Sequence, residues 1–338
     1  MSAQPSPQGT LSIQQLQEMG PPYPPQGASL GGAPTNSVDT PLSSVFIALF
    51  VASAALNMTI FQRNRRRGHK FILSALLFGF SMARISANVM RIVWANYPHD
   101  VPIAIAATIL TNAGVLLLFI VNLVLSQRIL RAHQPRVGWS KPASLAFKLL
   151  YAAVAALLVM VIVSTVYGFY TLDAHVRSQL RDIQLFAVTF LAVLAFLPIP
   201  IVALAVLLPR HGPVDHFGTR GRMRSRVLLV LFTATLLAFG AGFRAGVAYV
   251  QRPASNPAWF HHKAAYYCVN YTIEAIVVFT YALSRFDLRF HVPNGASEPG
   301  HYSKGVEGGA GHVAADGERP RTEMDDEDKE DKETRDTV

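Results

Sequence analysis

The sequence predicts an all-α integral membrane protein, a bundle of seven transmembrane helices with a disordered tail at each end. Half of the residues, 51%, are hydrophobic and only 15% are charged, whereas soluble domains have roughly 25% charged residues. Apolar runs of about twenty residues, the length that crosses a bilayer, recur through the chain. Lys and Arg gather in alternate connections between these runs, which is typical of a multi-pass membrane protein.

Seven apolar spans are expected, and their connections are short enough for antiparallel neighbours in a helical bundle. The spans cover residues 41–62, 71–95, 102–126, 143–171, 183–208, 227–250 and 264–284. In span five, Pro198 and Pro200 predict a kink, because proline removes a backbone hydrogen bond. The transmembrane domain is therefore placed at residues 41–291.

Both ends of the chain have the composition of disordered segments. Residues 1–40 are rich in Pro, Gln, Gly and Ser and contain no Lys or Arg, so they have little apolar surface to bury. Residues 292–338 are rich in Gly and end in a mostly acidic run, which is typical of a solvated tail. Because no basic segment precedes a short apolar run, no cleaved signal peptide is expected, and the first span serves as the signal anchor.

The orientation follows from the number of Lys and Arg residues in each connection. The stretches 63–70, 128–148 and 209–226 hold five each, whereas the alternate connections hold two or fewer. This bias predicts an extracellular N-terminus and a cytoplasmic C-terminus, which requires an odd number of spans. The plasma membrane is expected rather than an internal membrane. Membrane lipids and a cytoplasmic protein at the basic loops are the expected partners; nucleic acid is not, because the positive charges lie in short loops.

One carboxylate lies in the middle of an apolar span. Glu274 is in span seven, where an ionisable group is costly unless it is paired and therefore marks a function or a specificity device. At about 1.5 Å per residue, Glu274, Arg84 and Asn112 lie roughly 15 Å below the outer ends of their spans, and Arg244 and Asn270 about 9 Å below. Because an unpaired buried charge is strongly unfavourable, Arg84 is the expected partner of Glu274, and Arg244 the second candidate.

Helical spacing gives two of these spans a polar face. Arg84, Asn88 and Arg91 recur at i, i+4 and i+7 in span two and so share one face. Span seven shows the same pattern at Tyr267, Asn270, Glu274 and Tyr281. These groups either line a ligand or ion pathway or only fix the packing of the helices. In span six, Gly242 and Gly246 form a GxxxG pair, which predicts close helix packing.

No catalytic, metal or cofactor site is expected. The chain lacks the HExxH, GxSxG and P-loop patterns, and no two carboxylates lie close together within the membrane, so an enzyme is not predicted. Cys268 is the single cysteine, and the adjacent His261 and His262 lack further ligands, which gives the wrong geometry for zinc. Span seven has no central lysine for a retinal Schiff base.

The run HKAAYYCVNYTIEAIVVFTYALSRFDLRFHVPNG closely resembles the C-terminal signature of a fungal multi-pass membrane family, domain of unknown function 3112, also called "family c-likeg1". The resemblance is most specific over residues 259–295, and the span pattern from about 41 to 295 agrees with it. It implies a fungal source and seven helices, and it carries no assigned activity.

The chain is more distantly similar to the fungal lipid-translocating exporter family linked to aminosterol resistance. Arg244 and Glu274 match its arginine late in span six and its glutamate in span seven. The chain departs from that family at His291-Val292-Pro293, where an inserted residue separates the His-Pro pair, and in the tyrosine-rich surroundings of Glu274.

Three functions are consistent with these patterns. The first is a receptor-like or sensor protein that binds a small apolar or amphiphilic ligand in the outer half of the bundle, with Glu274, Arg84 and Arg244 as the polar floor and Asn270, Asn112 and Asn88 beside them. The second is a lipid or amphiphile translocator, which requires the polar groups to continue to the cytoplasmic face. The third is a structural membrane scaffold, in which the ion pair only fixes the helix register.

Overall fold

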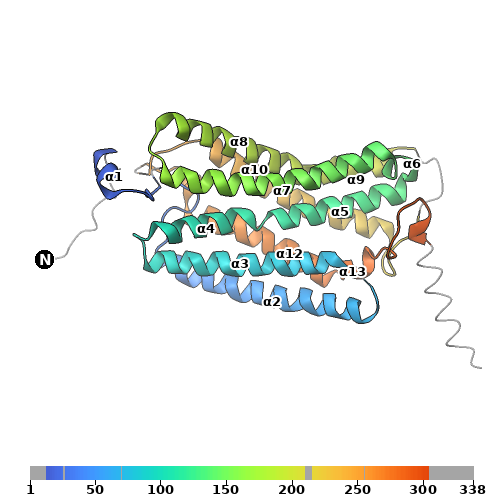
Figure 1. The fold of residues 1–338 in the computed structure, drawn as a ribbon. Coiled ribbons are helices and arrows are strands. Elements are labelled where there is room, and N and C mark those ends of the chain that lie inside the picture. Colours follow the sequence, from blue (N-terminus) through green and yellow to red (C-terminus); the bar gives the residue numbers. More distant parts are fainter. Residues whose placement is uncertain (1–12, 26, 70, 210–214, 255, 304–338) are drawn as a thin grey trace, which may run out of the picture.

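The computed structural model describes residues 13–25, 27–69, 71–209, 215–254 and 256–303. Within these ranges the protein is α-helical, and the only β contact is an isolated bridge between Gly27 and Pro253. The long helices lie side by side along one axis (Figure 1). The sequence prediction of an all-α fold is confirmed.

Six helical segments are long and apolar enough to cross a membrane, which supports a multi-pass membrane protein. They coincide with the first six predicted spans. Their bounds are α2, Asp39–Arg66; α3, Ile72–Asn96; α4, Val101–Ala113, with α5, Leu116–His133; α7, Lys141–Tyr170; α8, Ala174–Phe196, with α9, Pro198–Leu207; and α10, Met223–Tyr249.

The predicted seventh span is divided into three helical pieces. They are α11, Lys263–Tyr266, the π-helix η2, Tyr267–Thr272, and α12, Ile273–Leu283. None of the three alone has the length of a membrane span, so the seventh crossing stays a prediction. Residues 267–283 contact α2 and α10, which places Glu274 inside the bundle.

Four short helices lie outside the membrane spans: α1, Ile13–Met19; α6, Pro135–Gly138; η1, Trp259–His261; and α13, Phe286–Arg289. Two of the spans are interrupted. The break between α8 and α9 falls at Pro198, as the sequence predicts, because proline cannot donate the intrahelical hydrogen bond. The break between α4 and α5, at Gly114 and Val115, has no proline and was not predicted.

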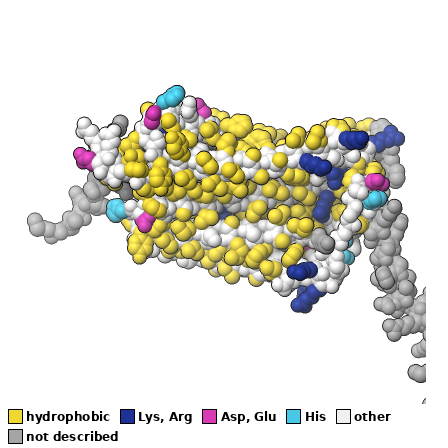
Figure 2. All heavy atoms as spheres, viewed as in Figure 1, with side chains coloured by type: hydrophobic (Ala, Val, Ile, Leu, Met, Phe, Trp, Pro, Cys, Tyr) yellow, Lys and Arg dark blue, Asp and Glu magenta, His cyan; other side chains and the backbone are white. Residues whose placement is uncertain are grey.

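Positive charge gathers at one end of the bundle, which we call the basic end. The loops after α2 and α5, the start of α10 and the residues around α13 meet there: Arg128 donates to the Phe290 carbonyl at 2.5 Å, and Asn294 to the Gly68 carbonyl at 3.1 Å. Figure 2 shows the Lys and Arg side chains at this end and apolar side chains along the length of the bundle. We call the opposite end, where α2 begins, the Asp39 end.

Parts of the two predicted tails contact the bundle, unlike the disordered segments that their composition predicts. Gly31 donates its N–H to the His261 carbonyl at 3.0 Å, and the Tyr302 ring packs against Phe217 and Trp139. The first twelve residues and residues 304–338, which include the acidic run, lie outside the described residues.

The GxxxG prediction is wrong for packing within this chain. Gly242 and Gly246 are exposed, and a Cβ added to either would meet nothing within 4 Å. The close approach on α10 occurs instead at Gly240, where an added Cβ would lie 3.5 Å from the Val269 carbonyl oxygen. Gly240 lies on a different side of the helix from Gly242, since each residue turns the helix by about 100°.

Candidate functional site: a buried layer of ion pairs

Arg84 of α3 and Glu274 of α12 form the bidentate ion pair that the depth of the two residues predicts. Arg84 Nε lies 2.5 Å from Glu274 Oε2, and Nη2 lies 2.7 Å from Oε1. Both side chains are almost completely buried, with 0% and 1% of their surfaces exposed. The two parallel, charge-assisted bonds fix the orientation of both groups.

The remaining nitrogen of Arg84 binds the broken end of α4. Its Nη1 donates to the Thr111 carbonyl at 2.6 Å and to the Leu110 carbonyl at 3.4 Å. The last carbonyl groups of a helix lack intrahelical partners, and the partial negative charge there favours a cation. The break at Gly114 therefore supplies acceptors to a guanidinium group that is otherwise surrounded by protein.

The guanidinium group of Arg84 occupies the space that a side chain at position 114 would fill, and Gly114 has none. A Cβ added there would lie 3.2 Å from Arg84 Cζ, so the guanidinium group would have to shift by a few tenths of an ångström within its bidentate pair. We expect Gly114→Ala to lower the free energy of unfolding by about 1–3 kcal/mol, the usual cost of overpacking. Thermal unfolding in detergent measures this effect, and Gly242→Ala is the control, because its Cβ would meet open space. An equal effect of the two substitutions would contradict the assignment.

Arg244 of α10 is the second cation beside Glu274, and it is held less tightly. Its Nη1 lies 3.6 Å from Glu274 Oε1, and 17% of its side-chain surface is exposed. The layer therefore contains two arginines and one carboxylate, with Arg84 fully engaged and Arg244 partly free.

The three predicted asparagines differ in position. Asn88 and Asn270 are buried, and the Oδ1 atom of each has no hydrogen-bond partner within the described structure; Asn88 Nδ2 donates to the Arg84 carbonyl at 2.8 Å. Asn112 is exposed, so its assignment to the polar layer is wrong. Its neighbour Thr111 contacts Arg84 instead, through its backbone carbonyl.

The π-helix η2 and the last residue of α11 place three tyrosines, Tyr266, Tyr267 and Tyr271, between the Glu274 layer and the Asp39 end. In a π-helix the hydrogen bonds join residues five apart, and here the hydroxyl groups of Tyr266 and Tyr271, five residues apart, lie 3.0 Å from each other. The Tyr271 ring contacts the Arg84 guanidinium group at 5.5 Å, and the Tyr266 ring contacts that of Arg91 at 4.6 Å. π-helical turns are frequent at functional sites.

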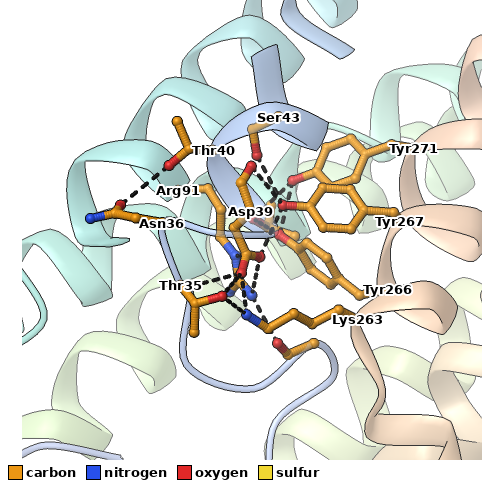
Figure 3. A network of polar contacts seen from close by, with 12 residues as sticks. Thr35, Asn36, Asp39, Thr40, Ser43, Arg91, Lys263, Tyr266, Tyr267 and Tyr271 are labelled. Carbon is orange, nitrogen blue, oxygen red and sulfur yellow. Dashed lines mark hydrogen bonds and ion pairs between the residues drawn. The ribbon is translucent and has the colours of Figure 1, made fainter. Parts of the chain in front are cut away.

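A second buried carboxylate, Asp39, begins α2 and lies within a network of polar contacts (Figure 3). It was not predicted as a site residue from the sequence. Arg91 Nε lies 3.0 Å from Asp39 Oδ1, Lys263 Nζ forms an ion pair with Oδ2, and the Tyr267 hydroxyl donates to Oδ1 at 2.9 Å. The Thr35 N–H donates to Oδ2 at 2.8 Å. These groups close the Asp39 end of the bundle.

The Asp39 cluster also holds the segment that precedes α2. Arg91 Nη2 donates to the Gly31 carbonyl at 2.9 Å, and Ala28 donates its N–H to the Arg252 carbonyl at 2.9 Å. Burial lowers the pKa of His261, whose Nδ1 accepts the Ala258 N–H at 3.2 Å. The segment of residues 28–38 therefore lies against the end of the bundle.

The positions of the charged residues along the predicted spans could have identified the Asp39 cluster from the sequence. Asp39, Arg91 and Lys263 lie at or near the outer ends of the first, second and seventh predicted spans, so the depth reasoning that paired Arg84 with Glu274 brings them together as well. The composition of residues 1–40 concealed this signal, because it assigned Asp39 to the tail.

Buried polar groups continue from the ion-pair layer toward the basic end. The Ser53 and Ser81 hydroxyl groups lie 2.9 Å apart, and the amide nitrogen of Asn57 donates to the Ser53 carbonyl at 3.0 Å. Farther along, the Thr233 hydroxyl donates to Asn122 Oδ1 at 3.0 Å, and Tyr281 binds the same oxygen. Asn57 Oδ1 and Asn122 Nδ2 have no partner within the described structure.

Within the described residues, no group of three or more His, Cys, Asp or Glu side chains has the arrangement of a metal site.

A family model described as "Protein of unknown function (DUF3112)" matches residues 135–220 and 218–291. This match agrees with the family resemblance that residues 259–295 carry. No curated protein and no solved structure matches the chain.

Proposed function

We propose that this multi-pass membrane protein of the DUF3112 family is receptor-like and binds a small amphiphile whose anionic head lies beside Arg244. The observation that supports this proposal is the excess of cations in the two buried clusters. Arg84 and Arg244 face one carboxylate, Glu274, and Arg91 and Lys263 face the other, Asp39. An uncompensated charge at bilayer depth is costly, and an anionic head would compensate one.

Arg244 is the cation that fits this role. Arg84 is fully buried, and its guanidinium nitrogens already donate hydrogen bonds to Glu274 and to the end of α4. Arg244 is 3.6 Å from Glu274 and retains exposed surface, so it can turn toward a ligand without breaking the Arg84–Glu274 pair. In the predicted seven-span topology with the N-terminus outside, Arg244 lies in the outer half of the membrane, and the ligand enters from the outer side or leaflet.

The ligand proposal predicts a preference for a carboxylate head over an uncharged head on the same chain. Purified protein in lipid nanodiscs should be stabilised thermally by a long-chain fatty acid and much less by the alcohol of equal length. Arg244→Gln should weaken binding of the acid by about tenfold or more, since a hydrogen bond to a charged group contributes about 1.5–3 kcal/mol. Equal stabilisation of the wild-type protein by acid and alcohol would contradict the proposal.

Arg252→Gln is the matched control, because it removes the same charge from an exposed position near the same end. We expect it to leave the preference for the acid unchanged. An equal loss in Arg252→Gln and Arg244→Gln would show a general charge effect and contradict a site at Arg244.

Translocation of a lipid or amphiphile is the second candidate. It is favoured by the polar groups at Asn57, Asn122 and Tyr281, which continue the buried polar face toward the basic end. Proteoliposomes test it directly: a translocator moves a fluorescent amphiphile between leaflets, and Asn122→Leu slows that movement without unfolding the protein. Binding without movement supports the receptor. A purely structural scaffold would neither bind the amphiphile nor move it between leaflets. A cytoplasmic protein partner at the basic loops stays a prediction.

A further inference from the structure

A hollow at the basic end lies outside the ion-pair layer and has a different chemistry. Its volume is about 450 Å³, within the range of small-molecule sites. It is formed by the loop before α10 and the first turn of that helix. The lining residues are His216, Phe217, Gly218, Thr219, Arg220, Gly221, Arg222, Met223 and Arg226.

The loop that lines this hollow is folded back onto α13. The Thr219 N–H donates to the Leu288 carbonyl at 2.8 Å, and the Gly218 N–H to the His291 carbonyl at 2.9 Å. Gly218 has a φ of 71°, and a Cβ there would lie 2.2 Å from the Arg289 carbonyl oxygen, so only glycine permits this approach. Backbone contacts therefore hold the shape of the loop.

The arginines around the hollow have no counter-charge within the described structure. Arg220, Arg222 and Arg226 line it, and Arg289 lies behind the loop and donates to the Ser225 hydroxyl. None of the four forms an ion pair with a described carboxylate; the nearby Asp215 accepts hydrogen bonds from Gly300 and Ser303 instead.

Arg226 is the central residue of this group. Only 5% of its surface is exposed, and its guanidinium group lies 4.6 Å from the Phe217 ring centroid. Its Nη2 makes one long bond, 3.4 Å, to the Arg220 carbonyl, and its Nε has no hydrogen-bond partner among the described residues. A buried donor without an acceptor costs about 1–3 kcal/mol, and an anion in the hollow would supply that acceptor.

The start of α10 borders the same hollow. Arg222 occupies the position before the helix, and no side chain of the described residues caps the N–H groups of the first turn. A helix N-terminus carries partial positive charge and binds phosphate groups through these N–H groups. The uncapped helix start and the buried Nε of Arg226 are independent features that favour the same type of ligand.

We propose that this hollow binds a phosphomonoester, with Arg226 and Arg220 on its oxygens and the α10 N-terminus behind it. Arginine is well suited to this role, because its planar group binds phosphate in a bidentate manner. The ester is carried either by a lipid headgroup in the leaflet at the basic end, where basic pockets bind phosphoinositides, or by a soluble molecule.

Lipid binding by the full-length protein in nanodiscs tests the proposal. Nanodiscs of phosphatidylcholine contain either phosphatidylinositol 4-phosphate or enough phosphatidylserine to match its charge, and native mass spectrometry counts the lipids retained. We expect retention of the phosphoinositide over phosphatidylserine and at least a tenfold loss of affinity in Arg226→Gln. Because Arg226 is buried, Arg220→Gln, at an exposed position, is the second variant and should weaken binding in the same direction.

Arg224→Gln is the matched control, since Arg224 is exposed in the same helical turn and does not line the hollow. An equal loss in this variant, or equal retention of phosphatidylserine, would overturn the proposal. Inositol 1,4-bisphosphate in solution distinguishes the two sources. If it displaces the lipid and binds with similar affinity, the hollow is a site for soluble esters; if only the lipid binds, the headgroup is the ligand. Binding of neither in folded protein would refute the site.

Discussion

Replacing Glu274 by leucine is expected to lower the free energy of unfolding by about 3–5 kcal/mol, because the substitution leaves a buried arginine without its counter-charge. Arg84 is completely buried and makes two of its hydrogen bonds with Glu274. Unfolding of the purified protein in mixed detergent, followed by circular dichroism, measures the change. Asp182→Leu is the control, since this carboxylate on α8 is exposed and forms no ion pair in the described structure.

The companion variant removes both charges. Arg84→Met combined with Glu274→Leu should recover most of the lost stability, because a buried ion pair replaced by apolar side chains of similar size is often neutral or stabilising. A double variant as unstable as Glu274→Leu alone would show that the arginine makes an essential contribution through α4, where it binds the Thr111 carbonyl. That outcome would contradict the interpretation of Glu274 as the principal partner.

Asp39→Asn is the second substitution with a large expected effect. It leaves Arg91 and Lys263 without their shared counter-charge, which should cost about 3 kcal/mol or more, as for other broken buried pairs. The segment of residues 28–38 depends on the same cluster, through Thr35 and the Gly31 carbonyl. The substitution should therefore accelerate amide hydrogen exchange in residues 28–38, and by more than in α2.

Asp100→Asn is the matched control for this prediction. Asp100 is exposed at the start of α4 and accepts the Ile103 N–H at 3.2 Å, a cap that asparagine replaces well. Exchange in residues 28–38 should not change in this variant. Unchanged exchange in Asp39→Asn as well would show that the segment is held by other contacts.

Hydrophobicity and depth predicted a large part of this structure. The six apolar segments were recognised because a bilayer requires about twenty apolar residues for each helix. The pairing of Arg84 with Glu274 followed from depth alone, since only a few ionisable groups share that level in the spans. Both predictions depend on distances along a helix axis, which the sequence determines directly.

The errors concern rotation about the helix axis and local backbone geometry. Asn112 has the expected depth but is exposed, because depth along the axis does not determine which side of the helix a residue occupies. The break at Gly114 was missed because no proline marks it. Gly242 and Gly246 match a packing pattern but face away from the neighbouring helices. The π-helix at Tyr267–Thr272 has no sequence signal that helical periodicity detects. Composition, averaged over residues 1–40, concealed the single residue Asp39.

Arg84 and Glu274 form a closed structural pair, and we propose Arg244 as the cation available to a ligand. The most direct test is the dissociation constant of a fatty acid and of its alcohol, measured by titration calorimetry on three proteins: the wild type, Arg244→Gln, and the Arg84→Met, Glu274→Leu double variant. We expect the double variant to keep the preference for the acid and Arg244→Gln to lose it. A preference kept by Arg244→Gln and lost by the double variant would contradict the claim.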